Sequence, residues 1–149
     1  DSTKLDYYGF HKWLSETSVK KYCTNSIILR LGSVLGKHMK KGPIYDLLNN
    51  NKLYMSKSSK LTFIDTDSIA NVILLLMLKQ TNGEIFNVSG TGNINVGELM
   101  DKFTFNNQID TKSSNNIYRY NINTKKINKL IKIESTVNIV DRFIRSMNS

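Results

Sequence analysis

The spacing of apolar and polar residues along the chain predicts an alternation of helices and strands. Residues 8–22 are predicted to form a helix, with Trp13 and Tyr22 among its larger apolar members. The nearly continuous apolar run at residues 27–31 is typical of a strand buried on both faces. The same reasoning predicts further helices at residues 43–48, 68–79 and 96–103, and strands at residues 52–55, 84–88 and 117–122. This alternation indicates an α/β sheet with an appended α+β lobe.

Several polar residues stand where helices are expected to begin. Asp67 can cap the helix that follows it, and that helix is apolar almost all round and is therefore expected to be buried. Asn95 and Glu98 have the spacing of a capping box. Thr124 and Thr136 are plausible caps for two final helices.

The first predicted helix carries a candidate catalytic pair. Tyr8 and Lys12 are four residues apart, so a helix would place the phenol and the ammonium on one face. A cation beside a phenol favours the phenolate, and such a tyrosine can pass a proton to or from a substrate oxygen. Because the chain has seven tyrosines and 17 lysines, a solvated lysine beside a packed tyrosine remains an alternative interpretation of the spacing.

The sequence around this pair resembles a known family. Residues 8–16 read Y-G-F-H-K-W-L-S-E and are similar to the Y-G-x-S-K-x-x-x-E signature of the extended short-chain dehydrogenase/reductases, the NAD-dependent epimerase/dehydratase family. Four later segments resemble that family in the same order. They are residues 28–36 (L-R-x-x-N-V-Y-G in the family), 63–70 (F-I-H-V-D-D-V-A), 83–90 (G-E-x-Y-N-V-G-S) and 124–131 (T-S-K-A-x-x-L-G).

The resemblance implies a fold and a domain organisation. The chain would be the C-terminal part of a Rossmann-type doubly wound parallel sheet with a small α+β substrate lobe. Residues 1–89 would be the remainder of the Rossmann-type domain, with residues 37–62 contributing to the lobe. Residues 90–149 would form mainly the lobe and the C-terminal helices. Homodimers are common in the family, and an uncovered edge at the strand of residues 27–31 would also promote association.

The resemblance also assigns roles to individual residues. Tyr8 would be the acid/base, and Lys12 would both assist the tyrosine and bind the nicotinamide ribose of NAD or NADP. Backbone groups at Gly32, Ser33 and Val34 would face the nicotinamide end of the cofactor. The family's catalytic Ser or Thr precedes the tyrosine and has no counterpart here.

Two residues are candidates for the substrate, which the resemblance implies is a nucleotide-linked sugar. Ser33 stands where the family usually has an asparagine. Arg119 is a candidate anion ligand, because the family often places an arginine in this late strand, although an exposed strand residue is an equal interpretation. Asp65 replaces the family's usual histidine, so its segment is expected to be structural.

The resemblance implies an NAD(P)-dependent epimerase, dehydratase or reductase that works by hydride transfer with tyrosine acid/base catalysis. A non-catalytic remnant that serves binding or assembly is the alternative. The eight glycines never form the G-x-x-G-x-x-G turn that holds the cofactor pyrophosphate. Gly90 and Gly92 follow a predicted strand, but Asn95 stands where a dinucleotide fingerprint needs a small residue. This chain alone is therefore expected to be inactive.

The charge of the chain raises the question of nucleic-acid binding. The net charge is +9, and lysine supplies 17 of the 21 basic residues, scattered without a recognisable nucleic-acid motif. We therefore expect no nucleic-acid partner. The densest cluster, formed by Lys37, Lys40 and Lys41, is either a solvated loop or a contact for a substrate diphosphate.

Composition also bears on metal binding, membrane association and location in the cell. Cys23, His11 and His38 are the only soft metal ligands, too few for a metal site. The longest apolar run, residues 72–78, is far shorter than the roughly 20 residues that span a bilayer. With no signal-peptide pattern at its start, the sequence predicts a cytoplasmic protein without a membrane partner.

Overall fold

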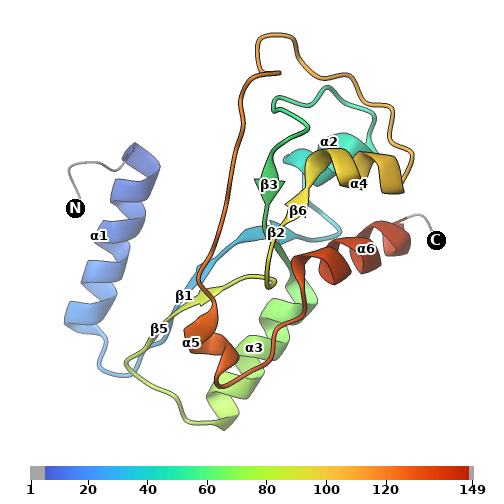
Figure 1. The fold of residues 1–149 in the computed structure, drawn as a ribbon. Helices are drawn as coiled ribbons and strands as arrows, with labels where there is room; N and C mark the ends of the chain where they lie inside the picture. The colour runs from blue at the N-terminus through green and yellow to red at the C-terminus, as the bar shows by residue number, and fades with distance from the viewer. Residues whose placement is uncertain (1–5, 148–149) are drawn as a thin grey trace.

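The computed structural model describes residues 6–147, and its first element is a long helix at one side of the molecule (Figure 1). Helix α1 spans Tyr7–Tyr22. The Asp6 side chain accepts a hydrogen bond of 2.7 Å from the amide of Gly9 and so caps the first turn. Lys20 and Lys21 lie in the last turn, where cations complement the helix dipole. The predicted helix is confirmed, and none of its residues is buried.

Two pairs of parallel strands follow. Strand β1 (Ile28–Leu31) pairs with β5 (Ile85–Val88), so that Ile28 lies opposite Ile85. Strand β2 (Ser33–Leu35) pairs with β4 (Phe63–Asp65). The parallel pairing and the intervening helices confirm the α/β prediction. The strand predicted at residues 27–31 is confirmed as β1. Its predicted burial on both faces is wrong, because none of its residues is buried and Arg30 and Leu31 are exposed, in a described sheet where β1 pairs with β5 on one side.

A smaller antiparallel pair lies toward the other end of the molecule. Strand β3 (Lys60–Leu61) pairs with β6 (Ile94–Asn95). Helix α2 (Pro43–Leu48) and helix α4 (Val96–Lys102) lie beside this pair in Figure 1. Pro43 opens α2 at a position where the missing amide costs no hydrogen bond. The elements of this end come from two stretches of chain that are distant in sequence.

Three further helices complete the body. Helix α3 (Thr66–Leu78) follows β4 directly, α5 (Lys125–Asn128) is a single turn that contacts β5, and α6 (Thr136–Met147) packs on β4. The buried core is continuous across these elements. Its largest fully buried side chains are Phe63, Phe86, Leu35, Ile44, Leu53, Ile64, Leu76, Ile127, Ile139 and Ile144.

Capping shows how local sequence sets the helix boundaries. Asn95 accepts a hydrogen bond of 3.1 Å from the Glu98 amide at the start of α4, as the capping box predicts. Helix α3 differs from the prediction, because Asp65 rather than Asp67 caps it, through a bond of 2.8 Å from the Ser68 amide. Asp67 instead lies within the first turn.

The two final helices also differ from the predicted caps. Thr124 precedes α5 but its side chain makes no capping bond. Thr136 is the first residue of α6, and its hydroxyl donates to the carbonyl of Gly92. Ser135 accepts from the Asn138 amide at 3.1 Å and so caps this end instead.

Two predicted strands are absent from the described residues. Around residues 52–55 only Leu53 pairs, through an isolated bridge to Ile109. Residues 117–122 run extended beside β3 but form only an isolated bridge between Lys60 and Arg119. In both places the backbone forms one isolated bridge rather than a continuous ladder of strand hydrogen bonds.

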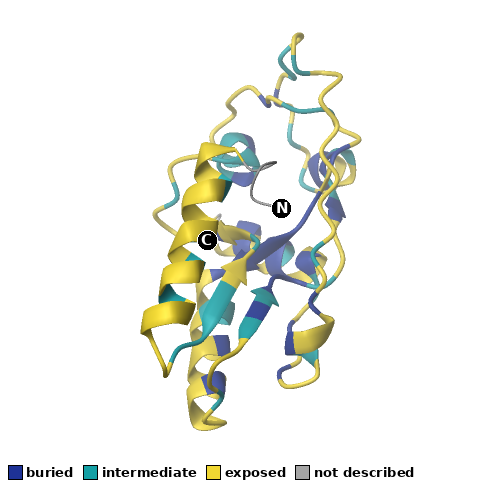
Figure 2. Cartoon of the chain, turned by 90° about the vertical axis from the view of Figure 1, so that its left-hand side faces the viewer, coloured by how far each residue is buried: buried dark blue, intermediate teal, exposed yellow. Residues whose placement is uncertain are grey.

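The burial of α3 contradicts the sequence prediction. Only Val72 and Leu76 of this helix are buried, although the sequence is apolar on nearly every face. Figure 2 shows that exposed residues dominate α1 and much of α3. Among the strands, β4 is buried along its whole length, whereas β1 has no buried residue. No helix within residues 6–147 is both long and apolar enough to cross a membrane.

Candidate functional site

The candidate catalytic residues lie on one face of α1. The ammonium nitrogen of Lys12 lies 5.5 Å from the centre of the Tyr8 ring. Tyr8 has an exposed fraction of 71%, so its hydroxyl is open to a ligand. The structure therefore brings together the pair that the sequence predicted, in the arrangement that the four-residue spacing requires.

Helix α1 is held by a pair of residues that the sequence analysis did not assign. Arg30 of β1 donates to both carboxylate oxygens of Glu16, through Nε at 2.7 Å and Nη2 at 2.6 Å. The hydrogen bond from Arg30 holds the pKa of Glu16 below its ordinary value, and Glu16 raises the pKa of Arg30. Glu16 lies four residues after Lys12, so this contact sets the position of the candidate catalytic face.

The signal for this contact was present in the family resemblance. Glu16 is the last residue of the matched Y-G-x-S-K-x-x-x-E segment, and Arg30 stands in the matched L-R segment. Neither segment by itself shows that the two side chains meet. Only the three-dimensional structure, which places α1 beside β1, shows that Arg30 is the partner of Glu16.

The predicted nicotinamide-facing residues lie at the junction of β1 and β2. The amide of Gly32 donates to the carbonyl of Val88 at 2.9 Å, so it is already used inside the sheet. A side chain at Gly32 would lie 2.5 Å from the hydroxyl oxygen of Ser89. Ser33 and Val34 are exposed and available to a ligand. This junction therefore needs a glycine for packing, and two neighbours can face a ligand.

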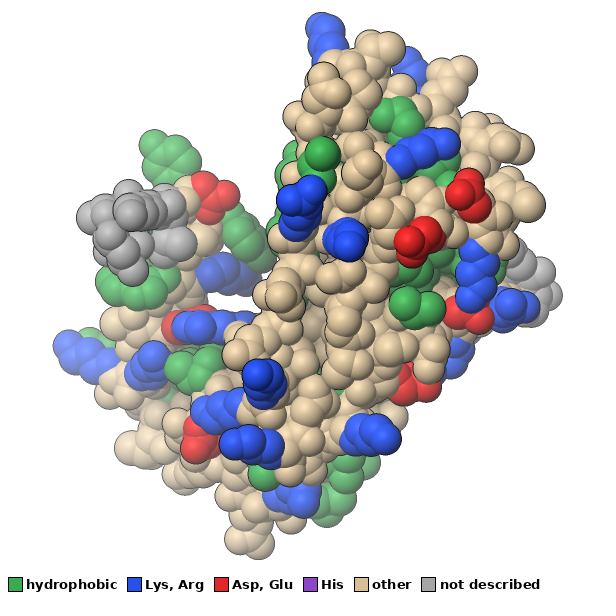
Figure 3. All heavy atoms as spheres, viewed as in Figure 1, with side chains coloured by type: hydrophobic (Ala, Val, Ile, Leu, Met, Phe, Trp, Pro, Cys, Tyr) green, Lys and Arg blue, Asp and Glu red, His purple; other side chains and the backbone are tan. Residues whose placement is uncertain are grey.

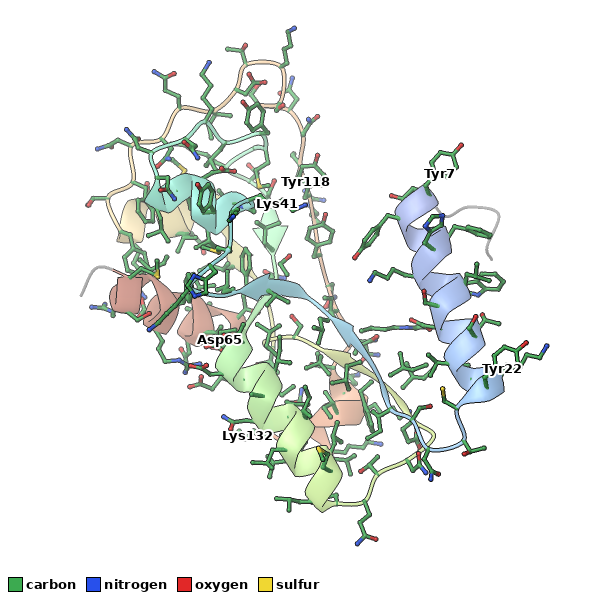
Figure 4. The ribbon with its side chains drawn as sticks, turned by 180° about the vertical axis from the view of Figure 1, so that it is seen from behind. Tyr7, Tyr22, Lys41, Asp65, Tyr118 and Lys132 are labelled. Carbon is green, nitrogen blue, oxygen red and sulfur yellow. The ribbon has the colours of Figure 1, made fainter. Side chains whose placement is uncertain are left out.

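An open groove separates much of α1 from the rest of the molecule. Figure 3 shows this hollow between the N-terminal part of α1 and the body. In Figure 4, Tyr118 and Lys41 lie on the body across the open space from the end of α1 that carries Tyr7. The hollow therefore lies beside α1, the helix that carries the candidate catalytic residues.

The candidate substrate residues lie on separate elements. Ser33 is on β2, whereas Arg119 is exposed on the extended segment beside Lys60. No hydrogen bond joins either of them to Tyr8 or Lys12 within the described part of the chain. The structure brings the candidate catalytic pair together and leaves the candidate substrate residues apart from it.

The residues present fit one end of a nicotinamide cofactor. The hydroxyl of Tyr8, the ammonium of Lys12 and the exposed residues Ser33 and Val34 are donors and surfaces of the kind that bind a ribose and a nicotinamide. The pyrophosphate end is different, because the glycines of the chain do not form the phosphate-binding turn. The fit is therefore restricted to the nicotinamide end.

Asp65 has a structural role, as the sequence analysis expected for its segment. Its second carboxylate oxygen accepts from Arg142 of α6 at 2.7 Å, and Arg142 also binds Glu134. Burial raises the pKa of Asp65, but the bonds from Ser68 and Arg142 more than offset this and lower it below its ordinary value. The carboxylate thus joins the start of α3 to α6.

A cleft of about 730 Å³ lies beside this ion pair. Its lining includes Val34, Lys37 and His38, together with Asp65 and Arg142. The three predicted loop lysines, Lys37, Lys40 and Lys41, are exposed, as expected for a solvated loop.

The sequence matches no protein-family model and no curated protein. The fold matches many solved structures. A UDP-galactose 4-epimerase is 16% identical, with a TM-score of 0.69 over 95% of this chain and 53% of that chain.

Two further structures have cofactor in their descriptions. The Bordetella bronchiseptica enzyme WbmG, in complex with NAD and UDP, is 18% identical, with a TM-score of 0.69 over 95% of this chain and 48% of its own. The dTDP-glucose 4,6-dehydratase of Bacillus anthracis, in complex with NAD, is 15% identical, with a TM-score of 0.67 over 94% of this chain and 50% of its own.

The chain spans about half the length of the solved structures it matches. At these identities the likeness is one of fold, and it agrees with the five motif segments in the sequence. The described chain therefore has the fold of the extended short-chain dehydrogenase/reductases, the group that includes the NAD-dependent nucleotide-sugar epimerases and dehydratases.

Proposed function

We propose that this chain is the C-terminal, tyrosine-bearing half of an NAD(P)-dependent epimerase, dehydratase or reductase that acts on a nucleotide-linked sugar. The observation that carries the proposal is the placement of Tyr8 and Lys12 on one exposed face of α1, in a chain with the epimerase fold. A second segment would supply the Gly-rich turn. That requirement is supported by the glycine pattern and by the half-length match.

The proposed chemistry follows from the side chains themselves. When bound, the nicotinamide cofactor accepts a hydride from a sugar carbon and returns one. Tyr8 takes the proton of the reacting hydroxyl as the hydride leaves, because its oxygen is exposed and beside a cation. Lys12 holds the cofactor ribose. The bidentate contact of Arg30 with Glu16 keeps this face in position.

The proposed substrate class rests on the matched structures. One of them is described with UDP and another with UDP-glucose, each together with NAD. In this chain Ser33 and Arg119 are the proposed contacts for the diphosphate, and both are exposed. Their separation from the tyrosine is consistent with a long ligand, whose sugar and nucleotide ends lie at different elements.

The test is Tyr8→Phe in a protein that carries this chain together with the cofactor-binding segment. The substitution removes the phenolic oxygen and keeps the ring, so we expect turnover to fall roughly 10²–10⁴-fold while cofactor affinity is retained. Lys12→Met should lower both turnover and cofactor affinity. Tyr7→Phe is the matched control, because Tyr7 is 90% exposed beside Tyr8 and should have no effect.

The same experiment distinguishes the alternative function. A non-catalytic remnant that serves binding or assembly would show equal behaviour for Tyr7→Phe and Tyr8→Phe. Normal turnover after Tyr8→Phe, in a protein that binds its cofactor tightly, would remove the catalytic assignment.

A further inference from the structure

The extended segment at residues 117–122 carries a pair of exposed aromatic side chains. The ring centres of Tyr118 and Tyr120 lie 6.3 Å apart, and the planes of the two rings differ by 21°. Their exposed fractions are 39% and 48%. Because the two residues are two positions apart in an extended chain, their rings lie on the same face of it. Such a nearly parallel pair offers a surface on which a third flat ring can stack.

Backbone hydrogen bonds fix the segment that carries these rings. The amide of Lys60 donates to the carbonyl of Tyr118 at 2.7 Å, and the amide of Tyr120 donates to the carbonyl of Lys60 at 2.9 Å. The amide of Tyr118 also donates to the hydroxyl of Ser59 at 3.1 Å. The backbone is therefore held on both sides of Arg119, and a ligand that stacks on the rings has little of it left to order.

The same segment runs on to the junction of β1 and β2. A side chain at Gly32 would place its Cβ 3.3 Å from the Cδ1 atom of Ile122, which follows Tyr120 by two residues. An extended chain rises about 3.3 Å per residue, so Tyr120 and Tyr118 lie about 7 and about 13 Å along the chain from that contact. The aromatic pair is thus set apart from the junction that we assign to the nicotinamide.

Two cations lie beside the aromatic pair. Lys60 and Arg119 form an isolated parallel bridge, so the two residues lie opposite each other and their side chains leave the same face. Like charges in such positions destabilise the pairing. Both side chains are exposed, and neither forms an ion pair with an acidic side chain within residues 6–147. An anionic ligand would relieve this repulsion.

The open edge of the segment allows one ligand to reach both faces. Side chains alternate along an extended chain, so Arg119 projects from the face opposite to the two tyrosines. On the side away from Lys60, residues 117–122 pair with no strand of the part of the chain that the structure describes. An anionic group at this edge can meet the long side chain of Arg119 while a ring attached to it lies on the tyrosines.

We propose that Tyr118 and Tyr120 hold the base of the nucleotide-linked sugar, an assignment that rests on the proposed function. The surface calls for a flat ring attached to an anion, and the base of a nucleoside diphosphate is such a ring. The sugar is the other ring of the ligand, but it has to reach the hydroxyl of Tyr8 on α1. In Figure 4, Tyr118 lies across the open space from the end of α1 that carries Tyr7.

The test is a titration of the 149-residue chain with UDP, followed by NMR. Tyr118→Ala and Tyr120→Ala should each raise the Kd for UDP about fivefold or more, which is the scale of stacking a base on an aromatic side chain. Tyr118→Phe and Tyr120→Phe keep the rings and should bind UDP as the wild type does. Tyr22→Ala, at an exposed tyrosine of α1, is the matched control and should have no effect.

Two further measurements separate stacking from charge and from folding. Inorganic diphosphate has no base, so its Kd should be the same in the wild type and in both alanine variants. Circular dichroism shows whether each variant is folded. Saturation transfer on the wild-type chain needs no variant, and the base protons H5 and H6 of UDP should receive more saturation than the ribose protons.

The possible results decide between the base and the sugar. A loss of affinity for UDP-glucose, with affinity for UDP unchanged, would assign the rings to the sugar and overturn the proposal. So would equal Kd values for UDP in the wild type and in both alanine variants, equal losses for UDP and inorganic diphosphate, or no binding of UDP in the millimolar range.

These results are independent of the test of the proposed function. Binding of UDP requires neither NAD nor the phenolic oxygen of Tyr8, so Tyr8→Phe should leave the Kd for UDP unchanged. Loss of turnover in Tyr8→Phe, with UDP affinity that does not depend on Tyr118 and Tyr120, would retain the function and remove this inference. Normal turnover in Tyr8→Phe, with UDP affinity that does depend on the pair, would remove the catalytic assignment and retain the stacking surface.

Discussion

Arg30 and Glu16 join helix α1 to strand β1 through two parallel hydrogen bonds, at 2.7 and 2.6 Å. No residue of α1 is buried, so apolar packing contributes little to its position. Arginine matches a carboxylate at two points, which fixes direction as well as distance. The direction in which Tyr8 and Lys12 face therefore depends on this pair.

We predict that Arg30→Lys loosens α1, because lysine keeps the charge but forms a single, flexible contact. An exposed pair of this kind is worth about 0.5–1 kcal/mol, so cleavage of residues 23–27 by a protease should accelerate about two- to fivefold. Lys102→Gln is the control, since it removes an exposed ion pair with Asp141, between α4 and α6 and away from α1. Equal cleavage rates in Arg30→Lys and wild type would show that other contacts hold the helix.

Acid should destabilise the fold partly through Asp65. Its pKa is lower in the folded state than in the unfolded chain, so the folded state binds fewer protons near pH 4. The stabilisation is present above the unfolded pKa of about 3.9 and is lost as the pH falls through the folded value. Urea unfolding between pH 7 and pH 2 measures this loss.

Asp65→Asn is the variant that isolates this effect. Asparagine also caps helices, so the bond from Ser68 can be kept while the charge facing Arg142 is lost. We expect lower stability at pH 7 and a shallower fall toward acid. A residual acid dependence should remain, because Glu16 and Asp141 also have lowered pKa values. An unchanged pH profile would contradict the role given to Asp65.

The contact between Gly32 and Ser89 predicts a compensating pair of substitutions. Gly32→Ala places a methyl group 2.5 Å from the Ser89 hydroxyl oxygen and 3.0 Å from its Cβ, and should cost about 1–3 kcal/mol. Ser89→Gly removes both atoms, and the hydroxyl has no hydrogen-bond partner to lose. In the double variant we expect at least about 1 kcal/mol of the loss to be recovered, measured by urea unfolding. Additive losses would refute the contact.

The isolated chain should bind NAD poorly and show no turnover. The pyrophosphate normally occupies a Gly-rich turn at a helix N-terminus, and the glycines here do not form that turn. Isothermal titration calorimetry of the 149-residue chain with NAD should give no binding in the micromolar range. Micromolar affinity would mean that another part of this chain holds the pyrophosphate.

Local sequence was sufficient where one segment carries its own signal. The helix of α1 and the capping bond from Glu98 to Asn95 involve residues within a few positions of one another. The same holds for the existence of strand β1, which its apolar run predicted, although none of its residues is buried. The Tyr8 and Lys12 pair is also local, because helix geometry alone places residues four apart on one face.

Other features depended on neighbours in space. Asp65 caps α3 because β4 ends there and Arg142 holds its carboxylate, whereas the sequence analysis predicted Asp67 as the cap. The alternating segment at residues 117–122 predicted a strand, but β3 beside it is only two residues long and supports a single bridge. Strand formation requires a partner of matching length, which the segment itself does not specify.

The sequence by itself determined the α/β alternation, the helix with its tyrosine and lysine, and the resemblance to the epimerase/dehydratase family. These follow from periodicity and from side chains a turn apart. Only the tertiary structure decided that Arg30 binds Glu16, that Gly32 makes room for Ser89, and that the apolar α3 is mostly exposed. The physical reason is that burial and ion pairing depend on which distant segments come into contact. The hydropathy of a segment indicates only how much free energy its burial would contribute, and not whether the segment is buried.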